Sequence, residues 1–246
     1  MSFAAVTRPA PRHGANLVIT CEHATAAMPA EYADLGLSAA QRADHIGWDI
    51  GAAAVVEELA RQLDAAAVLS GASRLLVDCN RDLPDADLIP SVSCGIAVPG
   101  NRAVDAAERA ARLARFYDPF HVAVDAALTQ HPGALLLSVH SFTPALHGRE
   151  RPFDIGVLFD AFDEVAHGLA ARAAASGFAV RLNEPYSGLD GLIFSARSHG
   201  TRHGARYVEL EINNRLLRTD AAARLVAARL TDAVGALLAS PSDAPA

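Results

Sequence analysis

Short apolar runs alternate along the chain with longer alanine-rich stretches. Apolar runs that are rich in β-branched residues and end abruptly in polar residues are typical of buried strands. They cover residues 16–21, 65–70, 75–78, 134–139, 155–159, 179–182 and 207–212. The alanine-rich stretches predict helices over 38–63, 104–129, 162–175 and 220–238, with a break at Pro119 in the second. Segment 84–101 is rich in proline and glycine and predicts an extended loop.

Alternation of apolar strands with helices implies an α/β fold. We predict one three-layer domain over residues 1–246, with a mostly parallel mixed sheet flanked by helices, a core at about 15–239 and frayed termini. Ligands of such sheets gather at the carboxyl ends of the strands. The polar residues that close strands 16–21 and 134–139 should therefore face one crevice.

Composition narrows the possible partners. The 246 residues suit one domain, and the net charge of −7 comes without any basic run or aromatic-basic stripe, which argues against a nucleic-acid partner. No apolar run approaches the roughly 18 residues of a membrane span, and no signal peptide is recognisable, so we predict a cytoplasmic protein without a membrane partner. The three cysteines are too far apart for a disulfide framework or a metal knuckle.

Three polar positions in different predicted elements could together bind a metal ion. His23 follows the first strand, His140 follows strand 134–139, and Asp49 lies on the first predicted helix. His45 is four residues before Asp49, so on a continuous helix both side chains would share a face. A catalytic zinc ion commonly takes three protein ligands and a water molecule, which His23, Asp49 and His140 could accommodate. Each residue could instead be structural: a hydrogen-bonded histidine, or a surface His-Asp pair.

Further charged residues could serve catalysis and substrate binding. Glu209 and Glu211 lie on the same side of a predicted strand, and either could take a proton from a metal-bound water, unless both simply face solvent. Asn80 and Arg81 end another predicted strand, where the planar arginine fork could hold a substrate carboxylate. The alternative is an ordinary ion pair between Arg81 and Asp78 or Asp82.

Two other functions fit parts of the same pattern. A serine or cysteine hydrolase could use Ser141 or Cys21 beside a histidine, although no G-x-S-x-G elbow surrounds Ser141. A domain of this fold that lacks a metal could instead bind a small molecule without cleaving it. Sensitivity to chelators separates the metal enzyme from both.

Several motifs, taken together and in order, resemble the N-formylglutamate amidohydrolase family. They span residues 17–217 and include ITCEHA at 19–24, HIGWDIGA at 45–52, SRLLVDCNR at 73–81, SVHSF at 138–142, NEPYSG at 183–188 and ELEIN at 209–213. The family is similar to zinc carboxypeptidases and aspartoacylases, which share a mixed sheet flanked by helices. The resemblance implies a zinc enzyme that cleaves the N-formyl or N-acyl amide of a small amino acid.

The resemblance also assigns roles to residues. It implies one ion of zinc, or of another divalent transition metal, with His23 and His140 as ligands. Asp49 or His45 must replace the glutamate that carboxypeptidases carry three residues after the first histidine, where this chain has Ala26. Our hypothesis takes Asp49 as the ligand and His45 as a substrate-binding residue.

The same hypothesis places the remaining residues around the substrate. Glu211 resembles the catalytic glutamate better than Glu209, Asn80 and Arg81 resemble the pair that grips a carboxylate, and Arg74 would stabilise the oxyanion. Glu22-His23 stands where the members best matched to N-formylglutamate have Pro-His. The acyl group and the amino-acid side chain therefore stay open, as does the oligomeric state.

Overall fold

The computed structural model describes residues 5–9 and 14–239, so the predicted frayed tail lies outside the described residues. A seven-stranded sheet forms the middle layer, in the order β1-β3-β2-β6-β11-β9-β10. Strands β3, β2, β6 and β11 are parallel, whereas β1 runs against β3 and the parallel pair β9 and β10 runs against β11. The strands span Val6–Arg8 (β1), Leu17–Cys21 (β2), Ala66–Leu69 (β3), Leu135–Phe142 (β6), Ile155–Leu158 (β9), Val180–Leu182 (β10) and Tyr207–Asn213 (β11).

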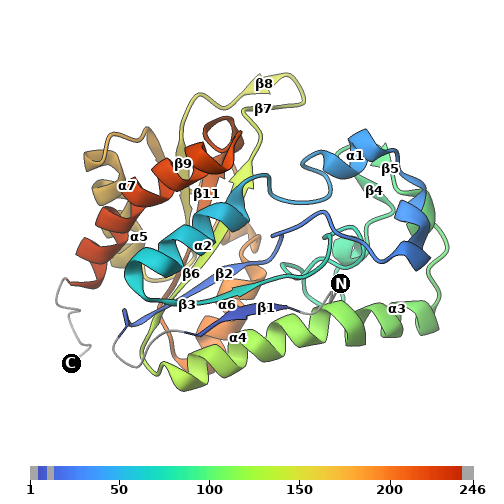
Figure 1. Ribbon diagram of the computed structural model, residues 1–246, viewed down its shortest axis with the longest axis horizontal. Coiled ribbons are helices and arrows are strands. Elements are labelled where there is room, and N and C mark those ends of the chain that lie inside the picture. The colour runs from blue at the N-terminus through green and yellow to red at the C-terminus, as the bar shows by residue number, and fades with distance from the viewer. Residues whose placement is uncertain (1–4, 10–13, 240–246) are drawn as a thin grey trace.

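Helices cover both faces of the sheet, as the three-layer prediction requires (Figure 1). One buried apolar cluster lies between the sheet and helices α2 (Ala52–Leu63), α5 (Asp163–Ala175) and α7 (Asp220–Leu238). A second cluster fills the opposite face, under α4 (Asp118–Gln130) and α6 (Phe194–His203). The shorter helices are α1 (Ala39–Ala43) and α3 (Ala106–Arg112).

Two small hairpins lie outside the central sheet. Strands β4 (Val92–Ser93) and β5 (Ile96–Ala97) form the first, within the segment predicted to be an extended loop. Strands β7 (Ala145–Leu146) and β8 (Arg149–Glu150) form the second, directly after β6 (Figure 1). Residues of both hairpins line the cavity described below.

Three features differ from the predicted elements. Residues 75–78 form buried turns rather than a strand, because their apolar side chains pack in the second core cluster without a neighbouring strand. The predicted helix 38–63 is broken: α1 ends at Ala43 and α2 begins at Ala52, so His45 and Asp49 do not lie on one helix. Strand β1 and helix α6 were not predicted.

The break between α1 and α2 has a local cause. Gly51 adopts a left-handed φ of 81°, and a Cβ atom there would lie 2.4 Å from Leu217 Cβ. The intervening loop is held to the site by a hydrogen bond of 2.9 Å from the Asp49 amide to the carbonyl of His23. The loop between α1 and α2 thus lacks helical hydrogen bonds and instead packs closely against the end of β2.

The predicted break at Pro119 takes a milder form. Residues Leu113–Tyr117 form a π-helical turn between α3 and α4, and Pro119 occupies the first turn of α4. The π-helical turn accommodates the proline: the Asp118 amide donates to the Leu113 carbonyl, five residues back, so the hydrogen-bond ladder shifts by one residue just before the missing N–H. The two helices consequently continue as one long rod along the edge of the molecule (Figure 1).

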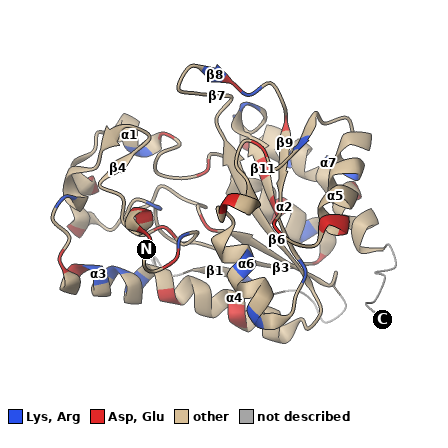
Figure 2. Cartoon of the chain, turned by 180° about the vertical axis from the view of Figure 1, so that it is seen from behind, with Lys and Arg blue, Asp and Glu red and all other residues tan. Residues whose placement is uncertain are grey.

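The charges are spread over the described surface. Figure 2 shows acidic and basic positions on many elements of the described chain. Helix α3 carries both signs of charge, at Glu108, Arg109 and Arg112, whereas the charged residues of α4 are the acidic Asp118 and Asp125. Among the residues that the structure describes, no helix combines the length and hydrophobicity needed to cross a membrane.

Candidate active site

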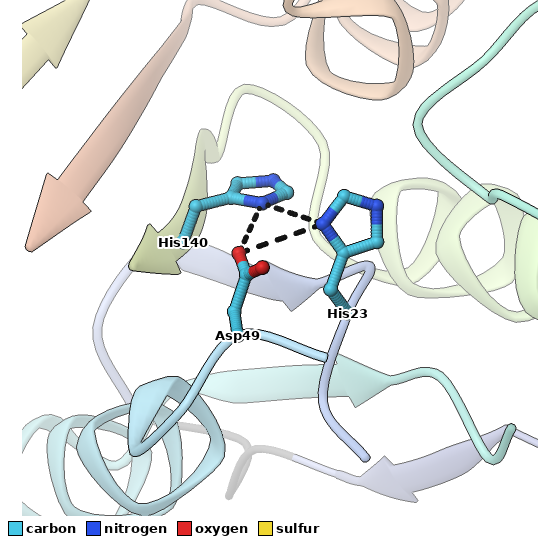
Figure 3. A group of neighbouring side chains, drawn as sticks. All are labelled: His23, Asp49 and His140. Carbon is cyan, nitrogen blue, oxygen red and sulfur yellow. Dashed lines mark hydrogen bonds and ion pairs between the residues drawn. The ribbon is translucent and has the colours of Figure 1, made fainter. Parts of the chain in front are cut away.

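Three buried donor groups meet near the carboxyl ends of neighbouring strands. His23 follows β2, His140 lies near the end of β6, and Asp49 comes from the loop before α2. His140 Nδ1 lies 2.8 Å from Asp49 Oδ2 and 3.1 Å from His23 Nδ1, and His23 Nδ1 lies 3.5 Å from Asp49 Oδ2 (Figure 3). Three distant stretches of chain therefore bring two imidazoles and a carboxylate to one point.

The far nitrogen of each imidazole faces another buried carboxylate. His23 Nε2 lies 2.6 Å from Asp78 Oδ1, and His140 Nε2 lies 3.2 Å from Glu22 Oε2. A carboxylate behind a histidine fixes the ring and directs the lone pair of its other nitrogen outward. Both rings thus direct Nδ1 toward the carboxylate of Asp49.

This donor set fits a divalent transition metal. Two imidazole nitrogens and one carboxylate oxygen are borderline ligands of the kind that zinc accepts at catalytic sites. Within the described part of the chain, His23, Asp49 and His140 form the one group of three such residues whose ligand atoms lie within 4.8 Å of one another. His45, the alternative third ligand in the sequence hypothesis, is not in this group.

Arg74 lies beside the three donors. Its Nη2 donates to Asp78 Oδ2 at 2.6 Å, and its Nη1 lies 3.1 Å from His23 Nδ1 and 3.7 Å from Asp49 Oδ1. The guanidinium therefore places a fixed positive charge next to the group, where an oxyanion could be stabilised. Its side chain is one-quarter exposed, which leaves it open to the cavity.

The two glutamates of β11 lie in different surroundings. Glu209 Oε2 lies 3.5 Å from His140 Nε2 and accepts a hydrogen bond from the Asn80 amide at 3.4 Å. Glu211 pairs in register with His140, lines the same cavity, and its buried Oε2 has no hydrogen-bond partner. Burial raises the pKa of Glu209 to about 7 and raises that of Glu211 well above its ordinary value.

Asn80 and Arg81 both line the cavity, but their side chains differ in what they already contact. The side-chain amide of Asn80 donates from Nδ2 to the Leu192 carbonyl at 3.3 Å, and its Oδ1 accepts a hydrogen bond from the backbone N–H of Ser195 at 2.9 Å. Arg81 Nη1 donates to the Asn80 carbonyl at 3.2 Å, and its carboxylate partner is more distant, since Nε lies 3.7 Å from Asp85 Oδ2. Arg81 is the freer of the two to meet a ligand.

His45 lines the cavity at a distance from the donor group. Its Nδ1 lies 2.8 Å from Asp44 Oδ1, while its buried Nε2 has no hydrogen-bond partner. Interactions with Cys94 of the β4–β5 hairpin and with Asp44 raise the pKa of His45 to about 9, against the effect of burial. His45 thus belongs to the rim of the cavity.

The alternative nucleophiles have other partners. The Ser141 hydroxyl donates to the Ile50 carbonyl at 3.0 Å, and its backbone amide donates to Asp49. Cys21 is fully buried, and burial raises the pKa of its thiol far above the ordinary value. Neither contact pattern activates a nucleophile, which disfavours the serine and cysteine hydrolase hypothesis.

The residues of the candidate site line a cavity of about 300 Å³. Its polar floor holds the three donors, Arg74, Asp78, Asn80, Arg81, Glu209 and Glu211. The hairpins and the loops beside them supply its outer wall. A small, polar-headed molecule would fit such a space.

Comparison with known protein families identifies the family of this chain. The profile of the N-formylglutamate amidohydrolase family matches residues 15–218. The chain belongs to this family. The match spans all the cavity-lining residues, from His23 to Glu211. No match was found among proteins with curated descriptions.

Solved structures support the fold. A gene product of Agrobacterium tumefaciens is 36% identical, with a TM-score of 0.89, over 96% of this chain and 94% of the other. An N-formylglutamate amidohydrolase from Ralstonia eutropha JMP134 is 18% identical, with a TM-score of 0.70, over 96% of this chain and 97% of the other. The family match makes the chain a hydrolase acting on amides. The structural matches confirm the fold predicted from its sequence.

Some residues of this amidohydrolase site were not singled out from the sequence. Asp78 was considered only as a partner for Arg81, yet it contacts His23 and Arg74; the i, i+4 spacing of Arg74 and Asp78 was the available signal. Glu22 was noted beside His23 without a role. Tyr186 lines the cavity from the NEPYSG motif, where the motif was the only signal.

Proposed function

We propose that this chain is a metal-dependent amidohydrolase that removes the N-formyl or another short N-acyl group from a small amino acid. The observation that carries the proposal is the convergence of His23 Nδ1, Asp49 Oδ2 and His140 Nδ1, each histidine backed by a buried carboxylate. One zinc ion, or another divalent transition metal, would be held by these three residues. When bound, it would acidify a water molecule and polarise the amide carbonyl.

Glu211 acts as the general base in this proposal. Its unpartnered, buried carboxylate faces the cavity, whereas Glu209 is already engaged by Asn80 and lies near His140. Burial raises the pKa of Glu211, and a bound metal ion would favour its ionised form and so lower that pKa again. Glu211 takes a proton from the attacking water and delivers it to the leaving nitrogen.

Arg74 and Arg81 have separate tasks. Arg74, aligned by Asp78, stabilises the negative charge that develops on the amide oxygen. Arg81 binds the α-carboxylate of the substrate and so positions the amide over the donor group. Asn80 supports this wall through its bonds to Glu209 and Ser195, and His45 contacts the substrate at the rim.

The direct test is metal analysis of the purified protein, followed by assays on a panel of N-formyl and N-acetyl amino acids, with release of the free amine as the readout. We expect about one metal ion per chain, activity that phenanthroline removes and zinc restores, and little activity on esters of unrelated alcohols. Binding of a panel member without product release would favour the binding-domain alternative. Activity that survives complete metal removal would contradict the proposal. A cytoplasmic location and the lack of a nucleic-acid partner stay predictions.

A further inference from the structure

The lining of the active-site cavity includes apolar residues beside polar ones such as Asp87, Ser93 and Thr143. Beyond the polar floor, the lining residues include Pro90 and Val92 from the β4–β5 region, Leu146 from the β7–β8 hairpin, and Leu192. Val92 is 54% exposed, although valine is usually buried. An apolar rim at the mouth of a polar cavity suits an apolar ligand group.

Positive charge in the cavity is limited. The chain contains no lysine, so its permanent cations are arginines. Among the described residues, Arg74 and Arg81 are the arginines that line the cavity. Arg74 is neutralised by Asp78 at 2.6 Å and lies 3.7 Å from Asp49. His45, at the rim, is paired with Asp44 at 2.8 Å. Arg81 is the cation with the weakest acidic partner.

One available arginine can hold one carboxylate. A second carboxylate on the substrate would enter a cavity that is also lined by Asp87, near the apolar side chains of Val92 and Leu146. An unpaired carboxylate in such surroundings loses hydration without gaining a partner. Arg151 does not line the cavity, but its guanidinium lies over the rings of Phe142 and Tyr186, which do.

We propose that the preferred substrate is a monocarboxylate, an N-acyl amino acid with an uncharged, largely apolar side chain, rather than N-formylglutamate. This inference rests on the proposed function and refines it. Arg81 takes the single α-carboxylate, and the wall of Val92, Leu146 and Leu192 contacts the side chain. Discrimination comes chiefly from the missing partner for a second negative charge.

The experiment compares N-formyl-L-leucine with N-formyl-L-glutamate on the zinc-loaded protein. Turnover is followed by amine release, and binding by calorimetry. We expect kcat/KM and affinity to favour the leucine compound by at least about tenfold. Equal or better values for the glutamate compound overturn the inference and leave the proposed function intact. If neither compound is hydrolysed, the proposed function fails, and the binding order alone decides the inference; binding of neither overturns both.

Charge variants sharpen the test. Val92→Arg supplies a second cation at the rim and should raise kcat/KM for the glutamate compound, relative to the leucine compound, by about tenfold. Val122→Arg is the matched control, because Val122 is 65% exposed on α4 and does not line the cavity. Arg151→Met should leave the preference unchanged. A selective loss of the glutamate activity in Arg151→Met would assign a second carboxylate to Arg151 and overturn the inference.

Discussion

At the scale of single residues, neighbours decide what identical side chains can do. Glu209 and Glu211 share a strand, a face and a cavity, so their spacing alone leaves either as the base. Contacts separate them: Glu209 supports His140 and Asn80, while one oxygen of Glu211 has no partner. A buried acceptor without a hydrogen-bond partner costs free energy, so its presence indicates a functional role. Glu211 is therefore the better base.

We expect Glu211→Gln to keep its metal and to lose turnover by about 10²–10⁴-fold, because a neutral amide cannot accept the proton. Metal content and kcat, measured on the same preparation, check this. Glu209→Gln is the matched control: loss of charge near His140 should weaken metal binding by about 10–100-fold, with turnover largely recovered at excess zinc. Unchanged turnover in Glu211→Gln would remove it from the mechanism.

Arg81→Ala should act on substrate binding rather than on chemistry. We expect KM to rise by about 10–100-fold for substrates with a free α-carboxylate, since a charge-assisted bidentate pair is lost. The same variant assayed on N-formyl amines without a carboxylate should match the wild type. An equal loss on both kinds of substrate would refute the anchoring role.

At the scale of elements, the loop between α1 and α2 holds the third donor. Residues 44–51 leave the helical path, and the Asp49 amide bonds to the His23 carbonyl, so the ligand loop and the end of β2 are coupled. Gly51 permits this path through its left-handed backbone and its close approach to Leu217. A side chain at Gly51 would push the loop away from His23.

Gly51→Ala should therefore destabilise the fold by roughly 2–4 kcal/mol and weaken metal binding, because left-handed strain and overpacking against Leu217 add together. Chemical unfolding and zinc titration measure the two effects. Gly204→Ala is the control: Gly204 also has a positive φ of 61°, but open space surrounds the added carbon. It should cost only about 1 kcal/mol and leave zinc affinity unchanged.

Much of the sheet could be predicted from the sequence, because its parallel strands are buried on both faces. The predicted runs at 16–21, 134–139 and 207–212 correspond to β2, β6 and β11, whose ends bear the site. The prediction of a strand at 75–78 was wrong, because an apolar pattern indicates burial and not backbone pairing. His45 and Asp49 had the right spacing for a helix face, but packing at Gly51 overrode helical periodicity. Asp78 and Glu22 escaped attention because only the folded chain shows what lies behind each imidazole.

At the scale of the whole molecule, a metal ion would tie three parts of the chain together. His23, Asp49 and His140 come from separate stretches, so an ion bound by all three favours the folded state. At a zinc concentration of 100 times Kd the gain is about 2.7 kcal/mol. This links the site to the stability of the entire domain.

The melting temperature should accordingly rise by about 5–10 °C when zinc is added to the metal-free protein, and EDTA should reverse the rise. Differential scanning calorimetry measures the shift. His140→Ala should abolish it, while the control His131→Ala, outside the cavity, should retain it. An equal shift in His140→Ala would place the ion elsewhere.

The two hairpins give the molecule a modular design. The proposed catalytic groups lie on the sheet and on loops anchored to it, whereas β4–β5 and β7–β8 pair only within themselves and contribute residues to the cavity lining. Sequence change in either hairpin need not disturb the central hydrogen-bond ladder. Homologues can therefore evolve different substrate specificities through a few substitutions in the hairpins, while the residues proposed to carry the reaction stay the same.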